Sequence, residues 1–338
     1  MNEHLQVKRS QWLTRVSLLV VSLLIVTHLN VRQGVKEGQT TRNSSQSFIH
    51  YEYGQPCAHC VHPHPASFNI PRFSGMSPKN WALKVLSIAV LYYEDPERLA
   101  EVVNSWLVLS DDLRRQILFL VIDDGSSLPA SDVVRALNGH TCTADILVFR
   151  VLDDIPWNIG GSRNLAMFVS PTRYVFLTDL DITVPSEVMA SLPYLIGEAE
   201  RRHDETGNET VFTHFRRVVQ GDTLPKREKP HPAVMLLTTS AYWRIGGCDE
   251  DFVGNYGFTD PHFMYRASRT PFISQVKCFQ NFKELAPLQQ AYSSETPDHA
   301  QSKNSSTNKL LFEHKKRFSG WSTTFLRFPW RQEVYPCA

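Results

Sequence analysis

Residues 174–185 read YVFLTDLDITVP, an apolar run of strand-forming residues that ends in two aspartates one residue apart. A short, continuous apolar run is typical of a strand that is buried on both faces of a sheet. Asp179 and Asp181 would then lie where the strand leaves the sheet, close enough together to bind one hard divalent cation, Mn²⁺ or Mg²⁺. An exposed acidic turn produces the same Asp-x-Asp pattern, so the motif alone leaves both interpretations open.

Further apolar runs alternate with helical patterns on the N-terminal side of this strand. The predicted strands are residues 85–91, 117–122, 146–151 and 174–177, and the predicted helices are residues 96–109 and 161–169. Strands that alternate with helices predict an α/β fold in which a mostly parallel, Rossmann-like sheet is flanked by helices. Ligands bind such sheets beyond the carboxyl ends of the strands, so the residues after each strand are the candidates for chemistry.

Two segments in such positions could contact a nucleotide. The sequence Asp123-Asp124-Gly125-Ser126 follows the second strand, where a carboxylate could accept from a nucleobase or a ribose, although a simple tight turn uses the same residues. Residues 157–164, WNIGGSRN, open the helix before the Asp-x-Asp strand, and a glycine-rich helix start with an arginine favours phosphate. Neither a Walker loop nor a G-x-G-x-x-G motif is present, which argues against nucleotide hydrolases, dehydrogenases and nucleotidyltransferases.

Taken together, five segments resemble the GT-A glycosyltransferases, especially those of family 2. In chain order they read LSIAVLYYEDPERL, VIDDGSS, WNIGGSRNLAM, YVFLTDLDITVP and AYWRIGGCDEDFVGNYGFTDPHFMYR. The last segment is also similar to the galactosyl- and N-acetylgalactosaminyltransferases, in which a metal-ligand histidine follows it. The resemblance covers about residues 84 to 270. It implies a GT-A fold, a nucleotide-sugar donor and a divalent metal ion.

The resemblance also implies roles for individual residues around the donor. Tyr93 would lie near the base, and Asp124 would bind the uracil or the ribose. Arg163 would lie by the nucleotide or its diphosphate. Asp179 and Asp181 would form the metal site, with Asp181 as the more direct ligand.

By the same resemblance, Asp260 takes the place of the family's catalytic base. The alternative is that Asp260 only caps a helix that begins at Pro261, because Asp is a favoured N-cap residue. The family's Glu before this position is Thr259 here, and that Glu commonly binds a sugar, so the substrate is less defined than the reaction. Residues 297–304 are similar to the stretch that follows the base motif in related galactosyltransferases, so the resemblance makes His299 a candidate third metal ligand. An imidazole beside two carboxylates would suit Mn²⁺. The other reading of His299 is a solvated loop residue, and His262 and His314 are weaker rivals for the metal.

For several further side chains the sequence allows either a functional or a structural role. Asp249 and Glu250 lie in Gly246–Phe252 and could touch donor-sugar hydroxyls or belong to a structural turn. Trp157 and Trp243 could stack on a sugar ring or pack in the core, where Trp is usually found.

The N-terminal part of the chain predicts a membrane anchor. Residues 16–31 contain no Asp, Glu, Lys or Arg, and no small-x-small cleavage site follows them, so an anchor is favoured over a cleaved signal peptide. The predicted organisation is a cytosolic tail (1–11), a transmembrane helix (12–31), a stem (32–80) and a luminal catalytic domain (81–338). Asn43, Asn208 and Asn304 begin Asn-x-Ser/Thr sequons, which are usable only in a lumen. These features predict a single-pass type II protein of the Golgi or endoplasmic reticulum.

Composition excludes several classes of protein. The chain has 338 residues and a formal net charge of +1, so nothing favours a nucleic-acid partner. A hydrophobic content of 42% excludes global disorder, and six cysteines are too few for a disulfide-built scaffold. The Cys57-x-x-Cys60 string has histidines beside it and could bind zinc, although a disulfide or a solvated loop fits an oxidising lumen better.

These observations predict a metal-dependent, inverting glycosyltransferase. It would move one sugar from a nucleotide sugar, with UDP as the expected nucleotide, to a hydroxyl group of a glycan, glycoprotein or glycolipid. No Gln-x-x-Arg-Trp string follows Asp260, which favours the transfer of a single sugar over processive synthesis. The alternative is a non-catalytic carbohydrate-binding relative that keeps the fold.

Overall fold

The computed structural model describes residues 84–219, 229–291, 305–318, 321–322 and 324–334. The predicted tail, transmembrane helix and stem lie outside these residues, and so do His299, Cys57, Cys60 and the sequons at Asn43 and Asn304. Within the described ranges, no helix combines the length and the apolar character that a membrane crossing needs.

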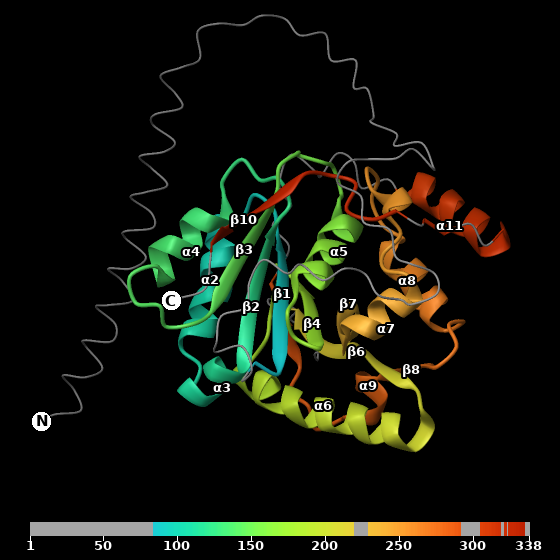
Figure 1. The fold of residues 1–338 in the computed structure, drawn as a ribbon, viewed down its shortest axis with the longest axis horizontal. Coiled ribbons are helices and arrows are strands. Elements are labelled where there is room, and N and C mark those ends of the chain that lie inside the picture. Colours follow the sequence, from blue (N-terminus) through green and yellow to red (C-terminus); the bar gives the residue numbers. More distant parts are fainter. Residues whose placement is uncertain (1–83, 220–228, 292–304, 319–320, 323, 335–338) are drawn as a thin grey trace, which may run out of the picture. The chain divides into compact units, whose positions relative to one another are not determined.

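A ten-stranded sheet forms the centre of the described chain (Figure 1). Its strands are β1 (Leu86–Tyr92), β2 (Ile117–Asp123), β3 (Ile146–Val151), β4 (Tyr174–Asp179), β5 (Ile182–Thr183), β6 (Glu209–Val219), β7 (Lys229–Thr238), β8 (Ile273–Lys277), β9 (Leu288–Gln290) and β10 (Trp330–Val334). Their order is β10-β3-β2-β1-β4-β7-β6-β9-β5, with β8 also paired to β6.

The sheet has two halves of different character. Strands β3, β2, β1 and β4 run parallel, which confirms the four strands predicted from the sequence. Beyond them β7 pairs antiparallel with both β4 and β6, and β10 pairs antiparallel with β3. The sheet is therefore mixed, and the predicted parallel arrangement holds for its N-terminal half. A mixed central sheet flanked by helices fits the expected GT-A fold.

Helices cover both faces of the sheet. They are α2 (Pro96–Leu107), α3 (Asp111–Gln116), α4 (Ala130–Asn138), α5 (Ile159–Val169), α6 (Ser186–Thr206), α7 (Thr239–Ile245), α8 (Thr259–Ala267), α9 (Cys278–Asn281) and α11 (Ser306–Phe318), with a 3₁₀ turn η2 (Glu250–Phe252). Helix α2 begins where the sequence predicts, because Pro96 fits a first helical position and the Asp95 carboxylate accepts from the Arg98 amide (3.0 Å).

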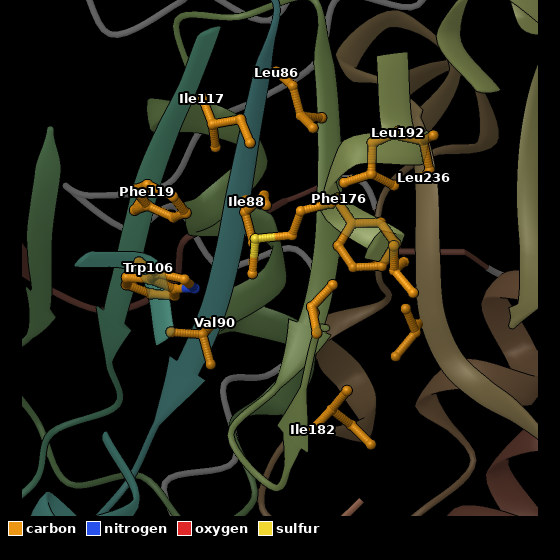
Figure 2. Close-up of a cluster of buried hydrophobic side chains, with 14 of the residues drawn as sticks. Leu86, Ile88, Val90, Trp106, Ile117, Phe119, Phe176, Ile182, Leu192 and Leu236 are labelled. Atoms are coloured by element: carbon orange, nitrogen blue, oxygen red, sulfur yellow. The ribbon is translucent and has the colours of Figure 1, made fainter. Parts of the chain in front are cut away.

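Two hydrophobic cores form because side chains alternate between the faces of each strand. On one face Ile88 and Val90 of β1 pack with residues of α2, α4 and α6, as Figure 2 shows in part. There the Trp106 ring stacks on Phe119 with 4.5 Å between the ring centroids. On the other face Ala89 packs with residues of α5, α7 and α8 and with the C-terminal segment 325–328. The C-terminal segment therefore packs back onto the domain.

The described cysteines differ in chemical state. Cys248 and Cys278 are buried free thiols. Cys142 is disulfide-bonded. Disulfides persist mainly in oxidising compartments.

Candidate active site

The carboxyl ends of three strands bring the predicted donor-site residues together. In the sheet register Tyr92 lies beside Asp123, and Leu91 lies beside Asp179. The residues that follow each strand therefore meet at one edge, where Tyr93, Asp124 and Asp179 line a pocket of about 220 Å³. This pocket is the candidate nucleotide site.

The two adjacent aspartates at the end of β2 make different contacts. Asp123 is buried and accepts from the amides of Ser126 and Ala130, both at 2.9 Å, so it holds the turn. Asp124 is 8% exposed and accepts from Asn158 Nδ2 and Ser162 Oγ, both at 2.8 Å. Burial raises the pKa of Asp124 to about 7. The interpretation of this segment as a tight turn therefore applies to Asp123, whereas Asp124 is the carboxylate that lines the pocket.

Aromatic side chains form part of the wall of the pocket. Tyr93 donates to Asp154 Oδ1 (3.1 Å), and burial raises the pKa of the Tyr93 phenol so that it stays neutral near pH 7. Trp157 is half-buried, lines the same pocket and makes an edge contact with Tyr256. Trp243 instead packs in the core against Phe325, so the sugar-stacking interpretation is wrong for Trp243.

A histidine that the sequence analysis missed lies beside the two aspartates. Asp179, Asp181 and His231 each offer a ligand atom within 4.8 Å of the others. Burial lowers the pKa of His231 to about 4, so its imidazole is neutral near pH 7. Two carboxylates and a neutral imidazole are a donor set that fits Mn²⁺. The Ala233 amide donates to His231 Nδ1 (3.2 Å), so coordination through Nε2 would move the ring proton to Nδ1 and break this bond.

The register between β4 and β7 explains why His231 lies there. The paired strands place Leu177 opposite Met235, and the same antiparallel register, continued past that pair, places His231 opposite Asp181. The rivals His262 and His314 do not belong to this group: His262 is buried against Phe252, and His314 contacts Phe318 on α11. Whether His299 is a ligand stays a prediction.

The turn that carries the two aspartates is fixed by neighbouring elements. Arg98 of α2 donates to the carbonyls of Leu180 and Asp181, both at 3.2 Å, and to Thr183 Oγ1 at 2.9 Å. Gln290 of β9 donates to Asp181 Oδ2 (2.6 Å). Burial, followed by the neighbouring charge of Asp179, raises the pKa of Asp181. A cation at this site would offset the repulsion between the carboxylates of Asp179 and Asp181.

Arg163 links the predicted metal site to the predicted base. The residue is 2% exposed on α5; its Nη2 donates to Asp179 Oδ1 (3.1 Å), and its Nη1 donates to Asp260 Oδ1. Arg163 is therefore engaged by two carboxylates, and the position by the nucleotide or its diphosphate that the resemblance implies stays a prediction.

Asp260 lies in the first turn of α8 with its side chain 23% exposed. The capping interpretation of Asp260 is wrong, because α8 already begins at Thr259. Its N-cap is Phe258, which provides no side-chain hydrogen bond.

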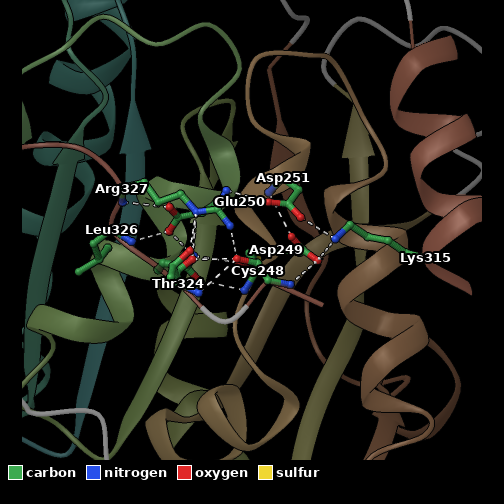
Figure 3. A network of polar contacts seen from close by, with 10 residues as sticks. Cys248, Asp249, Glu250, Asp251, Lys315, Thr324, Leu326 and Arg327 are labelled. Atoms are coloured by element: carbon green, nitrogen blue, oxygen red, sulfur yellow. Dashed lines mark hydrogen bonds and ion pairs between the residues drawn. The ribbon is translucent and has the colours of Figure 1, made fainter. Parts of the chain in front are cut away.

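Within the acidic run Asp249–Asp251, Asp249 and Glu250 are buried and Asp251 is half-buried, and Figure 3 shows the polar contacts that hold them. Glu250 is 5% exposed and accepts from Asn164 Nδ2 (2.7 Å) and from the amides of Leu326 (2.7 Å) and Arg327 (3.1 Å). Lys315 of α11 lies 2.9 Å from Asp249 and 2.7 Å from Asp251. The structural interpretation of Asp249 and Glu250 is confirmed, and the sugar-contact interpretation is wrong.

Comparisons with known proteins give matches in three-dimensional structure. No protein-family model matches the chain, and no curated protein matches its sequence. The chain is similar to S. aureus TarS 1–349 in complex with UDP-GlcNAc, at 14% identity and a TM-score of 0.46, over 64% of this chain and 61% of that one. It is also similar to mannosyltransferase PcManGT from Pyrobaculum calidifontis in complex with GDP-Man and Mn²⁺, at 13% identity and a TM-score of 0.44, over 64% of this chain and 59% of that one.

The match thus spans about three fifths of the length of these structures, and 37% of the longer TarS structure. At these identities and TM-scores, no donor, metal or activity carries over from them to this chain. The chain is similar to these proteins in fold alone.

Proposed function

We propose that this chain is a metal-dependent, inverting glycosyltransferase that moves one sugar from a nucleotide sugar to an acceptor hydroxyl group. The proposal rests on one observation, which is that the candidate nucleotide pocket and the candidate metal ligands form one continuous site. Asp179 belongs both to the pocket lined by Tyr93 and Asp124 and to the group formed with Asp181 and His231. A nucleotide in the pocket would therefore point its diphosphate toward the metal ligands.

Each part of the site has a defined task in such a reaction. Asp124 would accept from the base or the ribose, and Trp157 and Tyr93 would cover the nucleoside with their rings. Asp179, Asp181 and His231 would hold Mn²⁺ or Mg²⁺, which when bound offsets the charge of a leaving diphosphate. These residues bind and orient the donor before any bond changes.

Asp260 would act on the acceptor. An alcohol is a poor nucleophile near neutral pH, so a carboxylate must take its proton as the sugar–phosphate bond breaks. Asp260 is partly exposed and linked through Arg163 to Asp179, so a base at Asp260 would lie beside the proposed metal ligands. The reaction transfers the sugar to the acceptor oxygen, the proton to Asp260 and the electron pair of the broken bond to the nucleoside diphosphate.

The test is a panel of UDP sugars and GDP sugars, incubated with the full chain and Mn²⁺, with and without candidate acceptors. Release of the nucleoside diphosphate that depends on Mn²⁺ and ceases in EDTA supports the proposal. Binding of saccharides without release from any donor would favour the non-catalytic carbohydrate-binding alternative. Undiminished release in EDTA would contradict the metal dependence.

We infer a luminal location on the type II anchor predicted from the sequence. Three observations support it: the uncharged run at residues 16–31, the sequons, and the disulfide of Cys142, a bond typical of oxidising compartments. Endoglycosidase treatment of the chain expressed in eukaryotic cells should shift its gel mobility. No modification at Asn43, Asn208 or Asn304 would remove the main support for this location.

A further inference from the structure

A second pocket is rich in arginine and shares no lining residue with the candidate nucleotide pocket or with the group of metal ligands. It has a volume of about 610 Å³, and the lining residues used below are Arg244, Arg266, Arg269, Thr270, Phe272 and Trp321. We call it the arginine pocket. None of the described residues that line it is acidic. The pocket is therefore a cationic hollow with an aromatic wall.

Strand β6 separates the two sites. At its first residue, the Glu209 amide donates to the Phe272 carbonyl (2.8 Å), and Arg244 Nε lies 3.6 Å from the Glu209 carboxylate. At its last residue, Val219 pairs with Gln290, whose side chain binds Asp181. The eleven residues of β6 span roughly 30 Å, at about 3.3 Å per residue. The arginine pocket is thus separate from the donor site.

Arg266 is the central cation of the pocket. It is 7% exposed, and its Nη1 donates to the carbonyls of Gly246 (3.1 Å) and Gly247 (3.3 Å). Its guanidinium carbon lies 4.8 Å from the centroid of the Trp321 ring. A Cβ atom on Gly246 would meet Arg266 Nη2 at 1.6 Å, so only glycine leaves room for this guanidinium.

The remaining donors of Arg266 have no hydrogen-bond acceptor within the part of the chain that the structure describes. Among the described residues, neither Nε nor Nη2 makes a hydrogen bond, and Arg266 has no ion-pair partner. Arg266 lines the pocket, so its guanidinium lies within reach of a ligand there. Burial lowers the pKa of Arg266, as expected for a cation without a contacting carboxylate. An arginine more than nine-tenths buried, with donors accessible from a hollow, fits an oxyanion.

The rim adds a second cation and an aromatic surface. Arg269 is exposed and lies over the Tyr265 ring, without a carboxylate partner among the described residues. Phe272 is 64% exposed and has a φ of 62°, a backbone conformation that is strained for an aromatic residue. Strain of this kind collects at ligand-binding positions. Phe272 and Trp321 together provide apolar surface beside the arginines.

We propose that the arginine pocket binds an acidic saccharide, with its carboxylate or sulfate on Arg266 and Arg269 and a sugar ring against Phe272 and Trp321. The oxyanion follows from the arginines, whereas the saccharide rests on the proposed function. Such a site would hold a charged unit of an acceptor glycan outside the donor pocket, with Arg266 on the same helix as Asp260. Since the two sites are separate, donor binding should not depend on the arginine pocket.

The test measures binding to the purified full chain by calorimetry, without a donor. The probes are methyl glucuronide, glucose 6-sulfate, methyl glucoside and inorganic sulfate. We expect at least one of the two acidic sugars to bind about tenfold or more tightly than methyl glucoside, because charge-assisted hydrogen bonds contribute most of the affinity. Arg269→Gln should weaken that binding about tenfold.

Matched variants separate the pocket from general charge. Arg115→Gln removes an exposed arginine on α3 and should change the affinity less than about twofold. Arg266→Lys keeps the charge but not the planar fork and should also weaken binding. Equal binding of methyl glucoside, or no loss in Arg269→Gln, would overturn the proposal. Inorganic sulfate binding as tightly as the acidic sugars would reduce the pocket to an ion site and overturn the saccharide assignment.

The donor site provides the remaining control. Binding of UDP sugars should be the same in Arg269→Gln as in the unaltered chain. If acidic sugars bind but no nucleotide sugar is turned over, the proposed function fails while the oxyanion site stands. If nucleotide sugars are turned over but no acidic sugar binds, the oxyanion site fails while the proposed function stands.

Discussion

Two acidic clusters in this molecule look alike in the sequence and differ in the structure. The open cluster consists of Asp179, Asp181 and Asp260, and the sealed run consists of Asp249–Asp251. Both follow apolar segments, and both contain closely spaced carboxylates. In the open cluster Asp181 accepts a side-chain hydrogen bond from Gln290 alone among the described residues, and Asp260 accepts from Arg163 alone.

The sealed run is satisfied by the protein itself. Glu250 accepts from three donors, two of which are backbone amides of the C-terminal segment. Asp251 accepts from Lys315 and Arg327, both at 2.7 Å. Burying a carboxylate is costly unless hydrogen bonds and opposite charges offset the loss of water. A carboxylate whose partners all come from the chain therefore holds the fold, whereas one with unused acceptor capacity at a pocket is available to a ligand.

The largest expected effect is that of Asp181→Asn, which tests the open cluster directly. We expect turnover to fall about a thousandfold, because the diphosphate loses a ligand of its counter-ion. The thermal midpoint should not fall, because burial already raises the pKa of Asp181 and disfavours its charge. Sugar-transfer assays over a range of Mn²⁺ concentrations, with a melting curve for each protein, provide the measurement. Turnover within about tenfold of the unaltered chain would mean that the open cluster does not hold the metal.

Asp260→Asn should reduce transfer by at least about a hundredfold, because a carboxamide cannot take the acceptor proton. Its oxygen can still accept from Arg163, so folding and UDP binding should be retained. The measurement is kcat for transfer beside the dissociation constant of UDP. If transfer stays near normal, the base lies elsewhere. Asp249 and Glu250 cannot replace it, because both are sealed in the structure.

Glu250→Gln tests the sealed run, where the expected loss is stability. Both carboxylate oxygens of Glu250 accept hydrogen bonds, so the amide group of a glutamine would face an N–H donor in either orientation. This clash of two donors should lower the free energy of unfolding by about 2–4 kcal/mol. Glu313→Gln on α11 is the matched control, because Glu313 is exposed and should cost under about 0.5 kcal/mol. Denaturant unfolding measures both. A variant that is fully stable but loses UDP binding would place Glu250 at the donor instead.

The parts of the fold that the sequence predicts are those fixed by local periodicity. Strands β1 to β4 are continuous apolar runs, and α2 has its proline and its acidic cap, so each can be recognised from a few neighbouring residues. The second half of the sheet depends on pairings between distant segments. Strand β6, for example, contacts β7, β8 and β9, and no short pattern in the sequence determines that arrangement.

The candidate site divides in the same way. Tyr93, Asp124 and Asp179 could be predicted because parallel strands end at one edge. His231 could not, because its place depends on the register between β4 and β7. The structural use of Glu250 was also hidden, since its donors lie more than 70 residues away at Leu326 and Arg327. The sequence shows directly that a residue is charged, but it does not show which distant residues will bind that charge.

The smallest expected effect concerns Asp124, a carboxylate intermediate between the two clusters because it is buried yet lines the pocket. Its pKa of about 7 means that the carboxylate forms as the pH rises from 6 to 8. The affinity for UDP sugars, which have no group titrating in this range, should therefore increase about tenfold over these two pH units if Asp124 accepts from the base or the ribose. The pKa of Asp124 is higher in the folded chain than in the unfolded chain, so protonation of this carboxyl group stabilises the fold. The free energy of unfolding should therefore be greatest below about pH 4, where the carboxyl group is protonated in both states. It should fall as the pH rises through 7. Asp124→Asn should bind with a pH-independent affinity and lose this stability slope. An affinity that rises equally in Asp124→Asn would assign the titration to another group and place Asp124 with the sealed carboxylates.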